Sequence, residues 1–183
     1  NIDNVNGPDV AVVSYDYYNG KVLYFKCPSP ATSTWTANTL DSAVMSPNDI
    51  RIGDIEDATG GGDIVVASYY YYGAVYWYHN VNNDGVTWTK YTLASNLYYP
   101  TTVRVADMDQ DGDNDIAVLC YYYYSYFSTS TPMVMWYEND GTPTSGAWPM
   151  HPIFVPTTYN DGYAWCMDVG NFNGDAYPDV AWV

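Results

Sequence analysis

The sequence predicts an all-β protein built from blades of four short antiparallel strands, the repeating unit of a β-propeller. Two observations predict this class. Three apolar and aromatic segments repeat along the chain, and a fourth copy begins near its end. Aromatic residues make up 18% of the chain, and this residue type favours strands. No window shows a sustained 3.6-residue apolar period, so we expect no helix.

The repeat has a period of about 50 residues, a spacing typical of propeller blades. Similar segments begin at Asp9 (DVAVVSY), Asp63 (DIVVASY) and Asp115 (DIAVLCY), and a fourth begins at Asp179 (DVAWV). We therefore expect about three and a half blades in a single propeller, or propeller segment, over 1–183. The predicted repeats span 9–62, 63–114 and 115–178, with the fourth starting at 179.

Each repeat divides into four strand-like pieces separated by turn residues. Around the second repeat, the expected strands are 50–53, 64–70, 74–79 and 88–93. Asn82 to Gly85 supplies residues that tolerate the left-handed backbone of a hairpin connection. Four short antiparallel strands that recur at this period are the description of propeller blades.

Acidic residues dominate the charge. Lys and Arg total 5 against 21 Asp and Glu, a formal net charge of −16. This balance argues against nucleic acid or an anionic membrane as a partner and makes cations the natural counterpart. No stretch reaches the roughly 18 consecutive apolar residues that span a bilayer, so we expect no membrane insertion.

The densest acidic stretch joins the first two strands of a blade. It runs from Asp107 to Asp115, with oxygen-bearing side chains at alternate positions, then Gly112 and a closing aspartate. Calcium takes about 6 to 8 oxygen ligands and tolerates irregular geometry, so this spacing can wrap one ion. The final acid stands at the ninth position rather than the twelfth, and strands flank the loop, so an EF-hand is rejected.

The acidic pattern, followed by a short aliphatic strand and by the WYENDG stretch at 136–141, resembles the FG-GAP/VCBS repeat family. These repeats build calcium-loaded β-propellers, including the head of integrin α-subunits and many microbial extracellular proteins. The resemblance covers nearly the whole chain. It implies a propeller fold, calcium in the loop joining the first two strands of a blade, and a secreted or cell-surface location.

Carried over position by position, the resemblance implies calcium ligands in three loops. The loop at 107–115 matches fully, the loop at 171–179 has two amides in place of carboxylates, and the loop at 54–63 contains an inserted residue. The opening loop keeps Asn1, Asp3 and Asp9, but Val5 replaces a ligand, so we expect no working site there. The candidate ligands are Asp107, Asp109, Asp111, Asp115, Asn171, Asn173, Asp175, Asp179, Asp54, Glu56 and Asp63.

Tyrosines recur where the second strand of a blade turns into the third, at 17–18, 69–72 and 121–124. These turns lie on the face opposite the calcium loops, as do the connections between blades. Tyrosine offers a rigid apolar ring with a polar tip, suited to sugars and to protein surfaces. We expect Trp35, Trp88 and Trp148, by contrast, to pack between blades. The candidate ligand-binding residues are Tyr70, Tyr72, Tyr98, Tyr99, Tyr122 and Tyr124.

Catalytic groups are scarce. His79 and His151 fall on different strand types, and no nucleophile, acid and base are arranged as a catalytic set. Both histidines are expected to be structural, as are Cys120 and Cys166, which lie in apolar runs. A sugar lyase or dehydratase is the less favoured alternative to a non-enzymatic binding module.

The predicted function is a calcium-stabilised binding, adhesion or scaffolding module whose tyrosine face takes a carbohydrate or protein. The alternative is a self-assembling subunit of an extracellular filament or ring. The first repeat lacks its first strand and the last stops after its second, so unpaired edges invite pairing. We expect the missing strands to come from a longer chain of about six to eight blades, or from a neighbouring copy.

Overall fold

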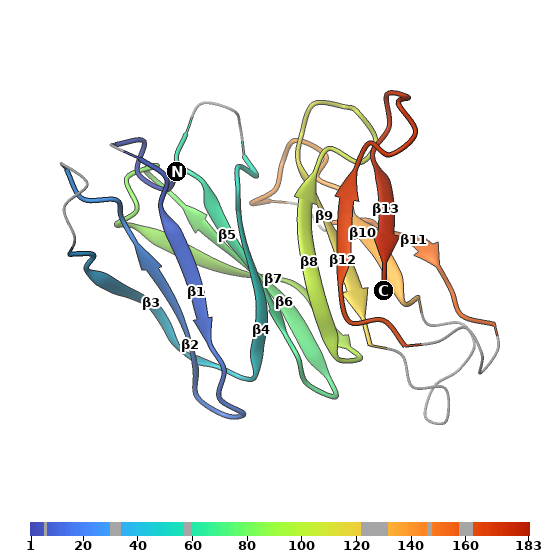
Figure 1. The fold of residues 1–183 in the computed structure, drawn as a ribbon, viewed down its shortest axis with the longest axis horizontal. Coiled ribbons are helices and arrows are strands. Elements are labelled where there is room, and N and C mark those ends of the chain that lie inside the picture. The colour runs from blue at the N-terminus through green and yellow to red at the C-terminus, as the bar shows by residue number, and fades with distance from the viewer. Residues whose placement is uncertain (6, 30–33, 57–59, 122–131, 146–147, 158–162) are drawn as a thin grey trace.

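The computed structural model describes residues 1–183 except 6, 30–33, 57–59, 122–131, 146–147 and 158–162. The described residues form thirteen strands and no helix (Figure 1), which confirms the all-β prediction. All strand pairs are antiparallel. Within the described part of the chain, nothing has the length and apolarity of a membrane-crossing helix.

The strands form three sheets and a C-terminal hairpin. The first sheet contains β1 (Val10–Ser14), β2 (Gly20–Phe25) and β3 (Ala37–Val44). The second sheet contains β4 (Pro47–Gly53), β5 (Asp63–Ser68), β6 (Gly73–Asn80) and β7 (Trp88–Leu97). The third sheet contains β8 (Pro100–Ala106), β9 (Asp115–Cys120), β10 (Val134–Tyr137) and β11 (Met150–Phe154). The hairpin pairs β12 (Met167–Gly170) with β13 (Asp179–Trp182).

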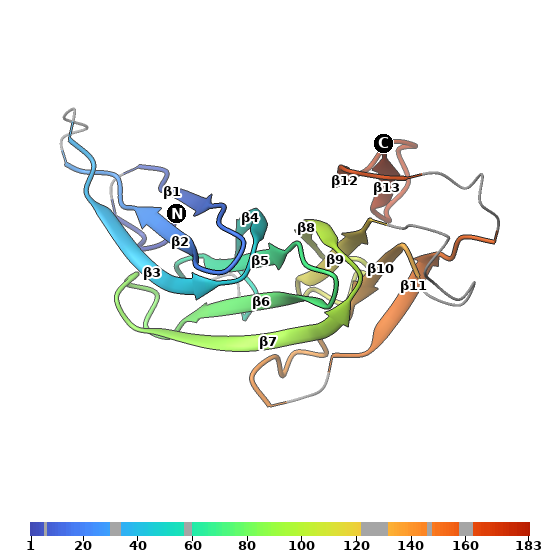
Figure 2. The same ribbon diagram turned by 90° about the horizontal axis from the view of Figure 1, so that it is seen from below.

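The sheets stand side by side along an arc, as Figure 2 shows, with β1, β4, β8 and β12 on its inner side and β3, β7 and β11 on its outer side. Neighbouring inner strands touch, since β4 contacts both β1 and β8, and β8 contacts β12. Arg104 on β8 connects three of them. Its guanidinium lies 3.1 Å from the Asp49 carboxylate on β4 and 2.7 Å from that of Asp168 on β12.

The core fills the spaces between consecutive sheets. Every residue of β5 and β9 is buried, because each of these strands has a sheet packed on both faces. Val65 and Ala67 pack in the cluster toward the third sheet, while Ile64 and Val66 pack in the cluster toward the first. A strand buried on both faces reads as a continuous apolar run rather than an alternating one, which is why these segments stand out in the sequence.

Three packing expectations are met, for Trp88, Trp148 and Cys120, and two are wrong, for Trp35 and Cys166. Trp88 lies 5.5 Å from the Tyr24 ring, and Trp148 lies 6.1 Å from the Trp77 ring, both between sheets. Trp35 is instead 40% exposed and belongs to none of the three core clusters. Cys166 is also exposed, because it precedes β12 at the end of the arc, whereas Cys120 is buried on β9.

The connections separate into two edges. In Figure 1 the loops joining β4 to β5, β8 to β9 and β12 to β13 follow the upper edge, which also holds the opening loop before β1. These four segments are called the first (1–9), second (54–63), third (107–115) and fourth (171–179) acidic loops. The turns joining β1 to β2 and β5 to β6 lie on the lower edge, which places the tyrosine turns opposite the acidic loops.

Candidate metal centre

The third acidic loop brings three of its four predicted ligands together. Carboxylate oxygens of Asp107, Asp109 and Asp115 all lie within 4.8 Å of one another. The backbone curls around Asp107, whose carboxylate accepts the N–H groups of Gln110 at 2.7 Å and Gly112 at 3.2 Å. Gly112 has φ +104°, a conformation that a side chain opposes, so the glycine is required for this bend.

Asp115 closes the loop at the start of β9, where it is fully buried. Its Oδ2 accepts the N–H of Met108 at 2.7 Å, and its Oδ1 accepts the N–H of Asn139 at 2.8 Å. One carboxylate thus fixes the start of the loop against the end of β10. The two hydrogen bonds also orient the carboxylate oxygens next to those of Asp107 and Asp109.

The clustered carboxylates oppose one another's ionisation. Burial, together with the nearby carboxylates of Asp109 and Asp111, raises the pKa of Asp115 to about 6. The pKa of Asp109 is raised by burial and by the carboxylates of Asp111, Glu138 and Asp107. A cation placed among these oxygens removes the repulsion. An all-oxygen, acidic donor set on a curved loop fits calcium, because calcium prefers hard oxygen ligands and accepts irregular geometry.

Asp111 is not part of the close trio. It is exposed, and its Oδ1 accepts the N–H of Asp113 at 2.9 Å. Its carboxylate is near enough to raise the pKa of both Asp109 and Asp115. Asp111 therefore contributes charge at the rim of the candidate centre.

The fourth acidic loop has its amides turned inward. Asn173 donates from Nδ2 to Asp175 at 2.9 Å and to Asp179 at 3.3 Å, and the Asn171 amide donates to the Asp175 carbonyl. Asp179 accepts the N–H of Phe172 at 2.7 Å, as Asp115 does with Met108. The backbone frame of the third loop is kept, but amide donors satisfy the carboxylates that would face a metal.

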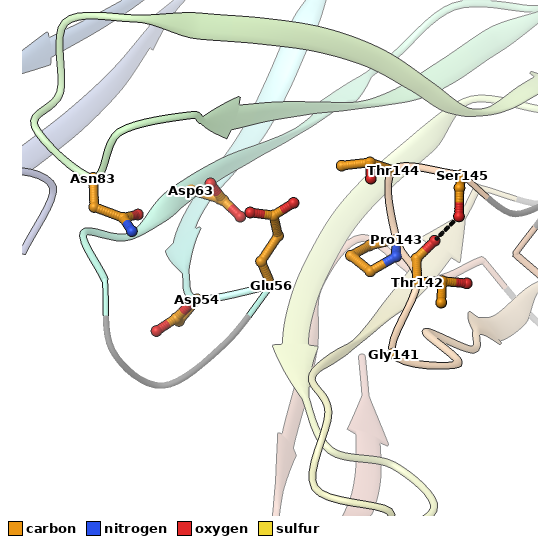
Figure 3. A pocket seen from close by; sticks show the side chains of 9 residues that line it. All are labelled: Asp54, Glu56, Asp63, Asn83, Gly141, Thr142, Pro143, Thr144 and Ser145. Atoms are coloured by element: carbon orange, nitrogen blue, oxygen red, sulfur yellow. Dashed lines mark hydrogen bonds between the residues drawn. The ribbon is translucent and has the colours of Figure 1, made fainter.

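The second acidic loop holds a histidine between its acids. His79 Nε2 lies 3.2 Å from Glu56, and His79 Nδ1 lies 3.5 Å from Asp63. Figure 3 shows Glu56 and Asp63 directed toward each other while Asp54 points away. The three acids line a cavity of about 440 Å³ whose opposite wall is the segment 141–145 of the third sheet. Of the described residues, Asp54, Glu56 and Asp63 do not form a close trio like that of the third loop.

The sequence analysis missed two features of this edge. The side-chain amides of Asn80, the last residue of β6, and Asn139, two residues after β10, donate to backbone carbonyls in the acidic loop of the preceding sheet. The side chains just before them face the acidic loop of their own sheet instead: His79 lies next to Glu56 and Asp63, and Glu138 lies opposite Asp115. A signal was present, because Trp77 to Asn80 reads WYHN and Trp136 to Asn139 reads WYEN. Both segments end in asparagine, but the residue before it is His79 in one segment and Glu138 in the other. The same structural position therefore holds two different side chains.

The tyrosine edge forms contacts from sheet to sheet. The ring centroid of Tyr17 in the first sheet lies 5.5 Å from that of Tyr70. The ring centroid of Tyr121 lies 6.4 Å from that of Tyr99 and 4.7 Å from that of Trp165. Backbone bonds accompany the rings, since the Tyr99 N–H donates to the Tyr70 carbonyl and the Tyr121 N–H donates to the Tyr99 carbonyl, both at 2.9 Å.

The predicted binding tyrosines differ in exposure. Tyr72 is 55% exposed and packs edge-on against Tyr71, with ring centroids 4.5 Å apart. Tyr70, Tyr98 and Tyr99 are half-buried. Tyr122 and Tyr124 lie outside the described residues. Further exposed rings on this edge, which the sequence analysis did not list as ligand-binding residues, are Tyr15, Tyr17, Tyr18, Tyr163 and Trp165.

Comparison with known proteins gives one match. Residues 57–118 match a family model described as an FG-GAP-like repeat, which confirms the resemblance over that part of the chain. The matched segment includes the whole third acidic loop and the first four residues of β9. No curated protein matches the chain, and no solved structure matches it.

Proposed function

We propose that this chain is a segment of a calcium-stabilised β-propeller that acts as a secreted or cell-surface binding module. The FG-GAP-like repeat supports this reading, as do the four-stranded antiparallel sheets arranged around an inner row of first strands. Calcium is assigned to the third acidic loop, where Asp107, Asp109 and Asp115 would hold it. The ion would stabilise the folded chain because it binds only the assembled loop.

The binding proposal rests on the tyrosine edge. Exposed rings such as Tyr18, Tyr72 and Trp165 occur on the same edge in three consecutive units. Rings at turns add little to the core between sheets, whereas a row of exposed rings offers flat apolar surface with hydroxyl tips. Such a surface suits the faces of sugar rings, and also protein surfaces. The ligand class we propose first is a neutral polysaccharide, because the net charge of −16 repels acidic ones.

Binding rather than catalysis is proposed because the two histidines lie apart from the aromatic surface, each next to a carboxylate. His151 Nε2 lies 2.6 Å from Glu138, and His79 Nε2 lies 3.2 Å from Glu56. Both pairs lie at the acidic edge, away from the tyrosine turns.

The test is retention of the purified chain on a panel of immobilised neutral polysaccharides, compared with the Tyr72→Ala variant. We expect wild-type binding to at least one member and a loss of about tenfold in Tyr72→Ala, the scale of one stacked aromatic contact. Phe172→Ala is the matched control, because Phe172 is similarly exposed, at 63% against 55% for Tyr72, and lies at the acidic edge. Equal binding by wild type and Tyr72→Ala, or no retention of wild type on any member, contradicts the carbohydrate assignment.

Assembly through sheet faces is the second candidate function. Val10 and Val12 on β1 are exposed, whereas the corresponding strands β5 and β9 are buried throughout. A further sheet, from more of the same polypeptide or from a second copy, would cover these valines. Sedimentation of the 183-residue chain as a compact monomer at all concentrations contradicts assembly between copies.

A further inference from the structure

One side-chain position holds a different ionisable group in each of the three sheets, and each time it lies opposite the aspartate that closes the acidic loop. The strand registers pair Val10 with Phe25, Ile64 with Tyr78 and Ile116 with Tyr137. The next residue along β2, β6 and β10 is therefore opposite the aspartate that closes the loop. We call this the strand-end position; its residues are Lys26, His79 and Glu138.

Backbone hydrogen bonds confirm that the three positions are equivalent. The residue after each strand-end position donates its N–H to Oδ1 of the closing aspartate. These bonds join Cys27 to Asp9 at 2.7 Å, Asn80 to Asp63 at 2.7 Å and Asn139 to Asp115 at 2.8 Å. The backbone frame around the loop is thus constant, and the side chain at the strand-end position is the variable.

Basic groups fill the first two loops. The Lys26 ammonium lies 3.7 Å from the Asp3 carboxylate and donates to the Asp84 carbonyl at 2.5 Å, so it also joins the first sheet to the second. The His79 imidazole lies 3.2 Å from Glu56 and 3.5 Å from Asp63, with little exposure to solvent. In each case a nitrogen donor of the chain lies among the acids where a metal ion would otherwise bind.

The third loop has a carboxylate at the same position. Glu138 stands opposite Asp115, because the preceding Tyr137 pairs with Ile116 and the following Asn139 donates its N–H to Asp115 Oδ1 at 2.8 Å. Its charge is also among those that raise the pKa of Asp109. Its orientation is fixed from the other side, because Oε2 is 2.6 Å from Nε2 of His151 on β11. Glu138 thus increases the negative charge of a loop that is already uncompensated.

We propose that the strand-end residue decides which acidic loop takes a metal ion. Glu138 makes the third loop a metal site by adding a negative charge to the Asp107, Asp109 and Asp115 cluster. Lys26 and His79 replace the ion in the first and second loops, which therefore do not fit calcium although both keep acidic residues. This inference rests on the calcium binding proposed for the third loop, and it revises the sequence expectation that Asp54, Glu56 and Asp63 hold calcium.

The first test places lysine, the strand-end residue of the first sheet, at the strand-end position of the third sheet. Glu138→Lys should weaken calcium binding at least about 100-fold by titration calorimetry, because it places an ammonium beside the trio. Its melting temperature in chelator should exceed that of wild type in chelator and should no longer respond to calcium. Asp16→Lys makes the same change of net charge at the tyrosine edge and should bind calcium as wild type does.

Glu138→Gln covers the case in which the lysine variant does not fold, and it should bind calcium at least about fivefold more weakly than wild type. Wild-type affinity in either folded variant overturns the role of Glu138.

The second test does not depend on metal. Lys26→Met should lower the melting temperature by about 2 °C relative to Lys21→Met, with and without calcium, since a partly exposed ion pair and its bond between sheets are lost. Lys21 is the matched control because it is exposed at the other end of β2. If Lys26→Met and Lys21→Met have the same melting temperature, Lys26 does not act as a counter-ion for the first acidic loop. If wild type binds no calcium while Lys26→Met is destabilised, the calcium assignment fails and the role of Lys26 stands.

Discussion

The side-chain amide of Asn139, at the end of β10, donates a hydrogen bond to the backbone carbonyl of Ile55 at 2.8 Å. Ile55 belongs to the second acidic loop, so the bond ties the third sheet to the loop of the preceding one. The same link occurs one sheet earlier, where Asn80 donates to the Ile2 carbonyl at 2.6 Å. Ile2 and Ile55 are both buried and pack against residues of the next sheet, so each acidic loop contributes a side chain to the core between two sheets.

Removal of this link should destabilise the fold. Asn139→Ala leaves the buried Ile55 carbonyl without the amide, and it also removes the acceptor for the Gly141 N–H. We expect the free energy of unfolding to fall by about 1–3 kcal/mol, the range for a buried hydrogen-bonding group left unsatisfied. Urea denaturation measures this loss. Asn82→Ala, at an exposed turn, is the control and should change stability by less than about 0.5 kcal/mol.

The stabilising effect of calcium should depend on pH through Asp115. Burial raises the pKa of this residue to about 6 in the folded chain, from an ordinary value of 3.8, so folding takes up a proton between these two values. Metal-free protein therefore loses stability as pH rises through this window, and calcium, which competes with the proton, binds better above it. We expect the calcium-induced rise in melting temperature to be larger at pH 7 than at pH 5. An equal rise at both values contradicts the role of Asp115.

Cys120 and Cys166 should differ in reactivity. Burial raises the pKa of the Cys120 thiol to about 12, and the side chain lies in the core between the second and third sheets. Cys166 is exposed. In folded protein at pH 8 a maleimide should modify Cys166 within minutes and reach Cys120 only after denaturation, because the thiolate is the reactive species. Peptide mass spectrometry measures this order, and modification of Cys120 as fast as Cys166 in folded protein contradicts the buried placement.

The fold was predictable where its determinants are local. Apolar runs such as 64–68 and 116–120 identify strands buried on both faces, and the tyrosine and acidic segments between them identify the two edges. The clustering of acids in the third loop was predictable for the same reason, since acidic residues alternate along nine consecutive positions. Asp111 was placed with the ligands on spacing alone, but its side chain turns to the Asp113 N–H at the rim.

Features that depend on contacts between distant segments could not be predicted. Asn139 and Ile55 are 84 residues apart, and nothing in the pattern near either one indicates their contact. The occupation of the second loop by His79 likewise depends on the pairing of β5 with β6. The exposure of Trp35 could not be predicted from the repeat either. Trp35 has the same position in the repeat as Trp88 and Trp148, but only those two pack against a core cluster.

Scanning calorimetry in chelator and in millimolar calcium tests most directly whether the third acidic loop binds calcium and thereby stabilises the chain. We expect calcium to raise the melting temperature of the wild type by about 5 °C or more, as mass action predicts for an ion that binds only the folded chain. The Asp109→Ala and Asp111→Ala double variant should show no such rise. Equal melting temperatures of the wild type in chelator and in calcium, or an unchanged calcium response in the double variant, contradict the claim.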